Sequence, residues 1–512
     1  MTFLTGRFQK TLVLWFFILV KFGLHCIIVA PEYDLHRDEY LHLDQGKHLA
    51  WGYLSVPPFT SWTSYIILLL GNSEFWVKFF PALFGVLTMV VVWKAIEALG
   101  GNLFALILGA TAITFSVLLR MNMLYQPNSV DILAWTFLYF AILQYIKTEQ
   151  NKWLYFAAAA LGFGFLNKYN VVFLIAGLVP ALLLTSQRKI FINKKLYLAA
   201  IITVLIILPN LVWQYTHHFP VLYHMKLLAK TQLVNVNRLD FLKEQLLFFL
   251  GSMFVILAAF VSFFVYPAFR KYQAFFWSFV FTLSLFTYLK AKGYYAIGLY
   301  PIFIAFGSVY LEYLFTKKLI WLRYVSILVM AALFIPIYQV AFPTKTPSTI
   351  AQNSKHYQKL GLLRWEDGKD HELPQDFADM LGWKELAGKV DAEYAKIADK
   401  EHTLVLCDNY GQAGAINYYS KYKNIGAVTM NADYIEWFPL DEEIRNVILI
   451  QNADDDDKDR KREQAFFEKV SLTGKIENPY AREYGASIYV LLNSKVSVNE
   501  ILKSEIEENR WE

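Results

Sequence analysis

Residues 196–213 read LYLAAIITVLIILPNLVW, a run of 18 positions that contains no charged side chain. At 1.5 Å per residue, a helix of this length crosses the ~30 Å hydrocarbon core of a bilayer. Ten other apolar runs between Leu12 and Ala341 have a similar character, so the chain is predicted to be a polytopic α-helical membrane protein. The eleven predicted spans are 11–30, 75–97, 103–119, 130–146, 153–167, 169–186, 196–213, 245–267, 273–289, 294–315 and 320–341.

Composition supports a membrane protein over a large soluble one. Of the 512 residues, 56% are hydrophobic and 17% aromatic, and the mean hydropathy is +0.34, more apolar surface than a water-soluble fold of this size can hide. The two cysteines, Cys26 and Cys407, offer no disulfide framework. The first run lacks a small-residue cleavage site, so it is predicted to be a retained span and not a signal peptide.

The net charge of +5 is unevenly divided. The segment from Ala341 onward sums to about −9, and the membrane part is correspondingly basic, with its cations gathered in alternate loops. If the N-terminus is cytoplasmic, the eleven spans place all of these cationic clusters on the cytoplasmic side, as the positive-inside rule requires. The positive charge therefore indicates membrane orientation and not nucleic-acid binding. The clusters are Lys147/Lys152, Arg188/Lys189/Lys194/Lys195, Arg270/Lys271 and Lys317/Lys318/Arg323.

The outer face then receives residues 31–71, residues 214–244 and the whole tail. Two domains are predicted, a membrane domain over 1–342 and a soluble extracytoplasmic domain over 343–512. Apolar strand-like runs at 403–407, 447–450 and 488–492 alternate in the tail with a helical stretch at 382–400, a pattern typical of a small α/β domain.

The first outer loop concentrates titratable side chains. Residues 33–62 read YDLHRDEYLHLDQGKHLAWGYLSVPPFTSW, and carboxylates at the mouth of a helical bundle usually mark a site. On a helix beginning near Arg37, Asp38 shares a face with His42, whereas Glu39 points about 100° away. One carboxylate can then face a cavity while the other is held elsewhere. The alternatives are that the acidic pair merely solvates a helix N-terminus, or that the histidines bind a metal ion.

Other candidates lie in the short turns on the same face. Arg120 and Asp131 bracket one turn and either pair with each other or contact a phosphate and a sugar hydroxyl. Lys168 lies in the next turn and Lys292 in a third, and three cationic turns on an outer face are explained by an anionic lipid headgroup. Tyr294 and Tyr295, which follow Lys292, are candidate donor-binding residues, and His42, His217 and His218 are candidate acceptor contacts. For Tyr294, Tyr295, His217 and His218 the alternative is an ordinary position at the membrane interface.

These motifs resemble the bacterial glycosyltransferase family 39, relatives of protein O-mannosyltransferases and lipid A aminoarabinose transferases. The similarity extends in order through DEYLHLDQGKHLAWGYLSVPPFTSW, MLYQPNSVDILAW, LGFGFLNKYNVVFL, LPNLVWQYTHHFP and KGYYAIGLYP, and into DNYGQAGAINYYSKY of the tail. The resemblance implies a C-type glycosyltransferase fold in a bacterial inner membrane and a polyprenyl-phosphate sugar donor. It also implies that Asp38 is the general base or orients the acceptor hydroxyl.

One departure from the family limits the comparison. The aminoarabinose-transferase branch has an acidic residue and a lysine before the PP pair, where this chain has Ser55 and Val56. The sugar and any metal ligand at this place are therefore not transferable, and the use of a divalent cation stays open.

The predicted function is transfer of a sugar from a polyprenyl-phosphate carrier to a lipid, protein or glycan acceptor on the outer side of the membrane. Two other classes of protein are alternatives. A transporter or flippase would place charged residues near the midplane of its spans, where this sequence has few. A receptor or scaffold would explain the tail but not the acidic first loop.

Overall fold

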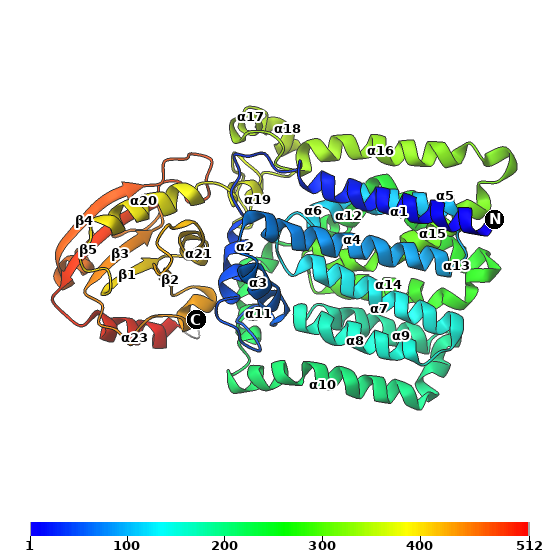
Figure 1. Cartoon of the computed structure of the whole chain (residues 1–512), viewed down its shortest axis with the longest axis horizontal. Coiled ribbons are helices and arrows are strands. Elements are labelled where there is room, and N and C mark those ends of the chain that lie inside the picture. The colour runs from blue at the N-terminus through cyan, green and yellow to red at the C-terminus, as the bar shows by residue number, and fades with distance from the viewer. Residues whose placement is uncertain (1, 510–512) are drawn as a thin grey trace.

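The computed structural model describes residues 2–509, with side chains from residue 6 onward, as two parts (Figure 1). A bundle of long helices forms one part, and a smaller α/β domain lies beyond one end of it. The N-terminal end of α1 lies at the opposite end of the bundle from this domain (Figure 1).

The bundle consists of helices that overlap every predicted span. They are α1 (Thr2–His25), α4 (Glu74–Ala98), α5 (Leu103–Thr114), α7 (Asn128–Thr148), α8 (Lys152–Asn167), α9 (Val171–Leu183), α10 (Lys194–Thr216), α12 (Arg238–Phe248), α13 (Met253–Val265), α14 (Gln273–Tyr288), α15 (Pro301–Leu314) and α16 (Leu322–Ala341). Short 3₁₀ segments join several of them: η1 (Ser186–Ile192), η2 (Leu233–Asn235), η3 (Leu250–Ser252), η4 (Pro267–Tyr272), η5 (Gly293–Leu299) and η6 (Lys317–Leu319).

By length and composition, five of the described helices can each cross a membrane, and eight spans result if each of three bent pairs counts as one. The bent pairs include α12 with α13, at 66°, and η5 with α15, at 49°. The predicted first span is too long, because α1 ends at His25 and residues 26–29 form a turn. The tight turn predicted at Asn167 and Lys168 is present, since α8 ends at Asn167 and α9 begins at Val171.

The bundle contains a buried cation, Lys21, inside an apolar run of the sequence. Lys21 of α1 has no exposed surface, and no described residue hydrogen-bonds its amino group. Gly85 of α4 makes room for it, since a Cβ at that position would lie 2.7 Å from Lys21 Cε.

A layer of short helices lies between the bundle and the tail (Figure 1). It contains α2 (Arg37–Gln45) and α3 (Phe59–Leu69), which lie between α1 and α4 in the chain, together with α6 (Val117–Met121) and α11 (Pro220–Thr231). The tail contributes α17 (Pro347–Gln352), α18 (Ser354–Lys359) and α19 (Gln375–Ala378) close to the same level.

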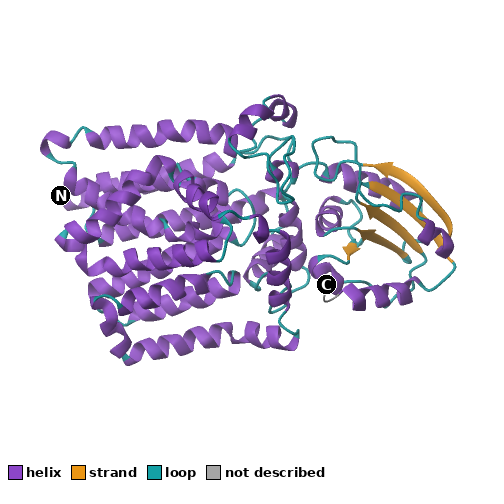
Figure 2. Ribbon diagram, turned by 180° about the vertical axis from the view of Figure 1, so that it is seen from behind, coloured by secondary structure: helices purple, strands orange, loops and turns teal. Residues whose placement is uncertain are grey.

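The tail folds as an α/β domain, as predicted, and holds all the described strands (Figure 2). The strand order is β2-β1-β3-β5-β4, with β1, β2 and β3 parallel and β5 antiparallel to both of its neighbours. The strands are β1 (Thr403–Cys407), β2 (Val428–Thr429), β3 (Asn446–Gln451), β4 (Phe467–Lys475) and β5 (Ser487–Ser494). The remaining helices are α20 (Trp383–Lys396), α21 (Tyr410–Tyr419), η7 (Ala432–Glu436), α22 (Lys461–Phe466) and α23 (Val498–Asn509).

The apolar core shows how the two parts are joined. One cluster of buried side chains fills the bundle. A second runs without a break from the segment between α1 and α4, through Tyr40 and Leu43 of α2, into Trp383 and Ile416 of the tail. The helix that carries the acidic pair is thus packed into the same core as the tail.

Candidate active site

The site is built on the first turn of α2. His36 is the N-cap, and its Nδ1 accepts a hydrogen bond from the backbone N–H of Asp38 at 3.2 Å. Asp38 and Glu39 follow in the first turn, where the helix dipole favours negative charge. The predicted division between the two carboxylates is present in the structure.

Asp38 faces a polar junction of three chain segments. Its Oδ1 accepts a hydrogen bond from Tyr410 of α21 at 2.7 Å, and its Oδ2 accepts one from the side-chain amide of Gln126 at 3.0 Å. The side chain is still 35% exposed. Burial favours the neutral carboxyl, but His36, Arg37 and the Tyr410 hydrogen bond together outweigh it, so the pKa of Asp38 is lowered. Asp38 is therefore an ionised and accessible carboxylate at neutral pH.

Glu39 is held inside the protein. It has no exposed surface, and its oxygens accept hydrogen bonds from Lys78 of α4 and from the backbone N–H groups of His36 and Tyr125, each at 2.7 Å. These bonds tie α2 to α4 and to the turn before α7. Glu39 therefore has no surface exposed to a ligand, and its bonds hold the first turn of α2 in place.

A chain of hydrogen bonds links Asp38 to Lys168. Beyond Asp38, Gln126 Oε1 accepts from Asn128 Nδ2 at 2.9 Å, and Asn128 Oδ1 accepts from the Lys168 ammonium at 2.8 Å. That ammonium lies over the ring of Tyr295 at 4.4 Å and the ring of Tyr294 at 5.2 Å. Among the described residues no carboxylate lies within ion-pair distance of Lys168, so its charge is available to an anionic ligand.

A small cavity opens beside this chain, between α3, α4 and α7. Its lining combines apolar and aromatic side chains with the polar side chains of Thr60, Thr63, Gln126 and Asn167. The lining residues are Phe59, Thr60, Thr63, Pro81, Phe84, Tyr125, Gln126, Val130 and Asn167.

Asp131 lies one turn into α7 and is buried. Its Oδ2 accepts a hydrogen bond from Asn170 at 3.0 Å, and the same amide group also donates to the backbone carbonyl of Tyr295 at 3.0 Å. Asp131 thus fixes the Tyr295 segment against the Lys168 turn. The alternative in which Asp131 pairs with Arg120 is wrong, because each has another partner.

Arg120 and Lys292 are both paired with carboxylates of the tail. Arg120 donates to Asp376 at 2.6 Å and to the backbone carbonyl of Ala341. Lys292 pairs with Glu366 at 2.6 Å. Of the three predicted phosphate-binding cations, Lys168 is the one without an ion-pair partner among the described residues.

The three candidate histidines do not meet at one place. His42 is 5% exposed and bonded through Nδ1 to Gln45 Oε1 at 3.1 Å, and burial lowers its pKa. His217 is exposed at the end of α10 and stacks on Trp213 of its own helix, with ring centroids 4.2 Å apart. His218 follows with a left-handed backbone (φ 59°).

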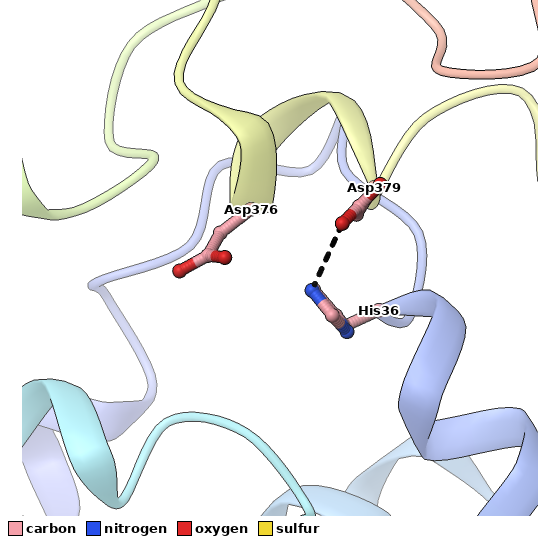
Figure 3. Close-up of side chains that lie close together, drawn as sticks. All are labelled: His36, Asp376 and Asp379. Atoms are coloured by element: carbon pink, nitrogen blue, oxygen red, sulfur yellow. Dashed lines mark ion pairs between the residues drawn. The ribbon is translucent and has the colours of Figure 1, made fainter. Parts of the chain in front are cut away.

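One cluster has the composition of a metal site (Figure 3). His36, Asp376 and Asp379 bring their ligand atoms within 4.8 Å of one another, and His36 Nε2 lies 3.6 Å from Asp379 Oδ2. However, Nδ1 of His36 accepts a backbone N–H, so the neutral ring carries its proton on Nε2, whereas a metal-bound histidine normally donates its other N–H. The carboxylates are also already paired, Asp376 with Arg120 and Asp379 with Arg482 at 2.9 Å. The residues therefore do not fit a resident divalent cation.

Sequence reasoning missed the residues that surround Asp38. Gln126 and Asn128 lie within MLYQPNSVDILAW, and Tyr410 lies within DNYGQAGAINYYSKY, but a polar side chain in a sequence carries no signal of what it touches. Lys78 was hidden inside an apolar span. A signal was available for Tyr410, because Asn409 is a typical N-cap residue and places the tyrosine at the start of a helix.

Comparison with known proteins agrees with this architecture. The family model for dolichyl-phosphate-mannose-protein mannosyltransferases matches residues 55–213. Lipid A galacturonosyltransferase RgtD of Rhizobium johnstonii is 25% identical over 209 residues, which cover 40% of this chain and 43% of that protein. The match thus spans less than half the length of this relative.

The whole fold matches solved structures. Two structures of ArnT from Cupriavidus metallidurans, one bound to undecaprenyl phosphate and one in the apo state, align over 94% of this chain and over 97% and 98% of theirs. Sequence identity is 13% in both, with TM-scores of 0.60 and 0.61. The protein is a polytopic membrane protein with the C-type glycosyltransferase fold. The resemblance to the family 39 glycosyltransferases, first noted in the sequence motifs, is confirmed.

Proposed function

We propose that this protein is an integral-membrane glycosyltransferase that moves a sugar from a polyprenyl-phosphate donor to an acceptor on the extracytoplasmic side. The observation that carries the proposal is the three-bond chain from the ionised Asp38 to Lys168, a cation without an ion-pair partner among the described residues. A base and an anion-binding group are thereby held at a fixed separation, as a transfer between a hydroxyl and a phosphate-linked sugar requires.

Each group has a defined part in the proposed step. The acceptor hydroxyl loses its proton to Asp38 while its oxygen forms a bond to the anomeric carbon. The bond from that carbon to the phosphate oxygen breaks, and polyprenyl phosphate leaves with the electron pair. Lys168 stabilises the charge on the leaving phosphate, and attack from the opposite side inverts the anomeric carbon.

The remaining candidates are proposed to have supporting parts. Arg120 and Lys292 are proposed to contact the donor phosphate when it displaces the tail carboxylates now paired with them. Tyr294, Tyr295 and Asp131 are proposed to shape the donor side. His217 and His218 are proposed to border the acceptor path. Glu39 contributes by holding α2 in place.

The relatives suggest which substrates to test. RgtD is named for a lipid A acceptor, and the matching family model for transfer of mannose from dolichyl phosphate to protein. We therefore propose lipid A-like glycolipids as first acceptors, with protein and glycan acceptors beside them.

The test supplies purified protein with a panel of radiolabelled polyprenyl-phosphate sugars and follows label leaving the lipid. Wild-type protein should transfer label from at least one donor. Asp38→Asn keeps the size of the side chain and its capacity to accept hydrogen bonds, but it removes the base and should lower transfer by at least about a hundredfold. A folded Asp38→Asn protein with full activity would refute the role of Asp38, and counter-transport of solute by vesicles without sugar transfer would favour a transporter.

A further inference from the structure

The tail places a tyrosine hydroxyl on the candidate base. Tyr410 Oη donates to Asp38 Oδ1 at 2.7 Å, across 372 positions of sequence. The guanidinium of Arg37 lies over the Tyr410 ring, 4.4 Å from its centroid. Tyr410 is therefore fixed both by its hydroxyl and by its ring, and both contacts are with the first turn of α2.

Tyr410 is rigidly mounted in the tail. It is the first residue of α21, whose N-cap Asn409 accepts hydrogen bonds from the N–H groups of Gly411 and Gln412. Gln412 is buried and donates to Glu483 at 2.5 Å. A hydroxyl mounted on a capped helix start loses little freedom when it meets a partner, so its hydrogen bond positions that partner effectively.

The helix that carries Tyr410 also packs unusually close to α2. A Cβ at Gly414 would lie 2.5 Å from Tyr40 Cβ, so only glycine allows the two backbones to approach this far. Asp44, at the other end of α2, accepts hydrogen bonds from Tyr434 at 2.7 Å and Asn417 at 2.8 Å. The α2–α21 interface is thus fixed along its whole length, with Tyr410 at the end nearest Asp38.

We propose that Tyr410 is a positioning residue for sugar transfer, so that the tail domain completes the active site by orienting the carboxylate of Asp38. This inference rests on the proposed function. Tyr410 and Gln126 each hold one carboxylate oxygen, which leaves Asp38 a single orientation and an exposed edge toward the acceptor.

Other groups also set the charge state of Asp38. His36, Arg37 and His42 face it from the start of α2 and favour its ionised form. Tyr294 of η5 and Asp376 of α19 also interact with its charge. A hydrogen bond to the ionised carboxylate lowers its pKa, and burial together with the Asp38 charge raises the pKa of Tyr410 itself, so the hydroxyl stays protonated and remains a donor.

Tyr410→Phe removes only the hydroxyl, because phenylalanine keeps the ring under Arg37. Without the donor, the pKa of Asp38 should rise, so the acidic limb of the kcat/KM profile should move to higher pH. Near neutral pH, kcat should fall about tenfold or more, because a hydrogen bond to a charged group is lost. Donor KM should change little.

Tyr418→Phe is the matched control. Tyr418 lies on the same helix and its hydroxyl also bridges the two parts, donating to the backbone carbonyl of Asn72 at 2.9 Å, but it does not touch Asp38. It should leave the acidic limb where it is in wild type. Equal profiles for wild type and Tyr410→Phe, or equal shifts in both variants, would overturn the proposal.

A second readout separates this inference from the proposed function. The pH dependence of carbodiimide modification at Asp38, mapped by mass spectrometry on the full-length protein, reports carboxyl protonation without any substrate. Modification should extend to higher pH in Tyr410→Phe than in wild type or Tyr418→Phe. If wild type transfers no sugar but this shift is present, the proposed function fails and the effect of Tyr410 on Asp38 stands. If wild type transfers sugar but the shift is absent, the proposed function stands and the effect of Tyr410 on Asp38 is refuted.

Discussion

Two adjacent carboxylates have opposite environments at the start of α2. Asp38 keeps an exposed edge, whereas Glu39 accepts four hydrogen bonds and has no exposed surface. Helix geometry alone produces this difference, because neighbouring side chains point about 100° apart. The sequence could therefore predict that the pair divides, since that depends only on the helix beginning near Arg37.

The identity of their partners could not be predicted in the same way. Gln126 lies 88 positions from Asp38, and Tyr410 lies 372 positions away. Such contacts depend on how whole elements pack, and no local pattern in the sequence encodes them. The pairing of Arg120 and Lys292 with tail carboxylates was missed for the same reason.

Replacement of Lys168 tests its proposed contact with the donor phosphate. Lys168→Gln keeps a hydrogen-bond donor for Asn128 but removes the charge, so donor KM should rise about tenfold or more and kcat should also fall, because the leaving phosphate loses its stabilising cation. Lys147→Gln is the control, since Lys147 lies in the last turn of α7 and donates to the carbonyl of Ala98 at the end of α4. Unchanged donor kinetics in Lys168→Gln would remove Lys168 from the phosphate site.

At the scale of elements, the close approach of α2 and α21 depends on one glycine. In Gly414→Val, the new side chain would overlap Tyr40 Cβ and the Tyr434 hydroxyl, 2.5 and 2.6 Å from the Cβ position. Overpacking of this kind costs about 1–3 kcal/mol, so the melting temperature in detergent should fall and transfer should be lost as Tyr410 separates from Asp38. Gly388→Ala in α20 is the control, because a Cβ there meets no atom within 4 Å. A Gly414→Val protein as stable and active as Gly388→Ala would show that the interface can open without consequence.

Two carboxylates near α19 form ion pairs with two of the cations proposed to bind the donor phosphate: Asp376 with Arg120, and Glu366 with Lys292. Glu366 holds Lys292 in a partly exposed ion pair, an interaction worth up to about 1 kcal/mol. If donor phosphate must compete with this carboxylate, Glu366→Gln should lower donor KM by up to about fivefold with kcat unchanged. Asp367→Asn should have no effect, because its carboxylate pairs with His371 at 2.9 Å. A higher KM in Glu366→Gln would instead mean that the pair holds Lys292 in its binding position.

At the scale of the whole molecule, the fold was the most predictable feature. Apolar length and loop charge are properties of continuous segments, and the bilayer imposes them directly on the sequence. The strands at 403–407, 447–450 and 488–492 were likewise predicted, while β2 has only two residues and β4 is largely exposed, so neither has the apolar run that marks a buried strand. The continuous core between first loop and tail was not foreseen, because it joins segments that the sequence presents as separate domains.

The proposed mechanism depends on the orientation of the protein in the membrane. The N-terminal end of α1 and the tail lie at opposite ends of the bundle (Figure 1), and the basic loops predict that the N-terminal end is cytoplasmic. In a background with both native cysteines replaced, Lys359→Cys in exposed α18 should react with a membrane-impermeant maleimide in intact cells. Lys189→Cys, at an exposed position of η1 that is predicted to be cytoplasmic, should react only after permeabilisation. The reverse pattern would place Asp38 and Lys168 on the cytoplasmic side, away from an extracytoplasmic acceptor, and transfer on the outer face would then be ruled out however well the isolated protein handled a polyprenyl-phosphate sugar.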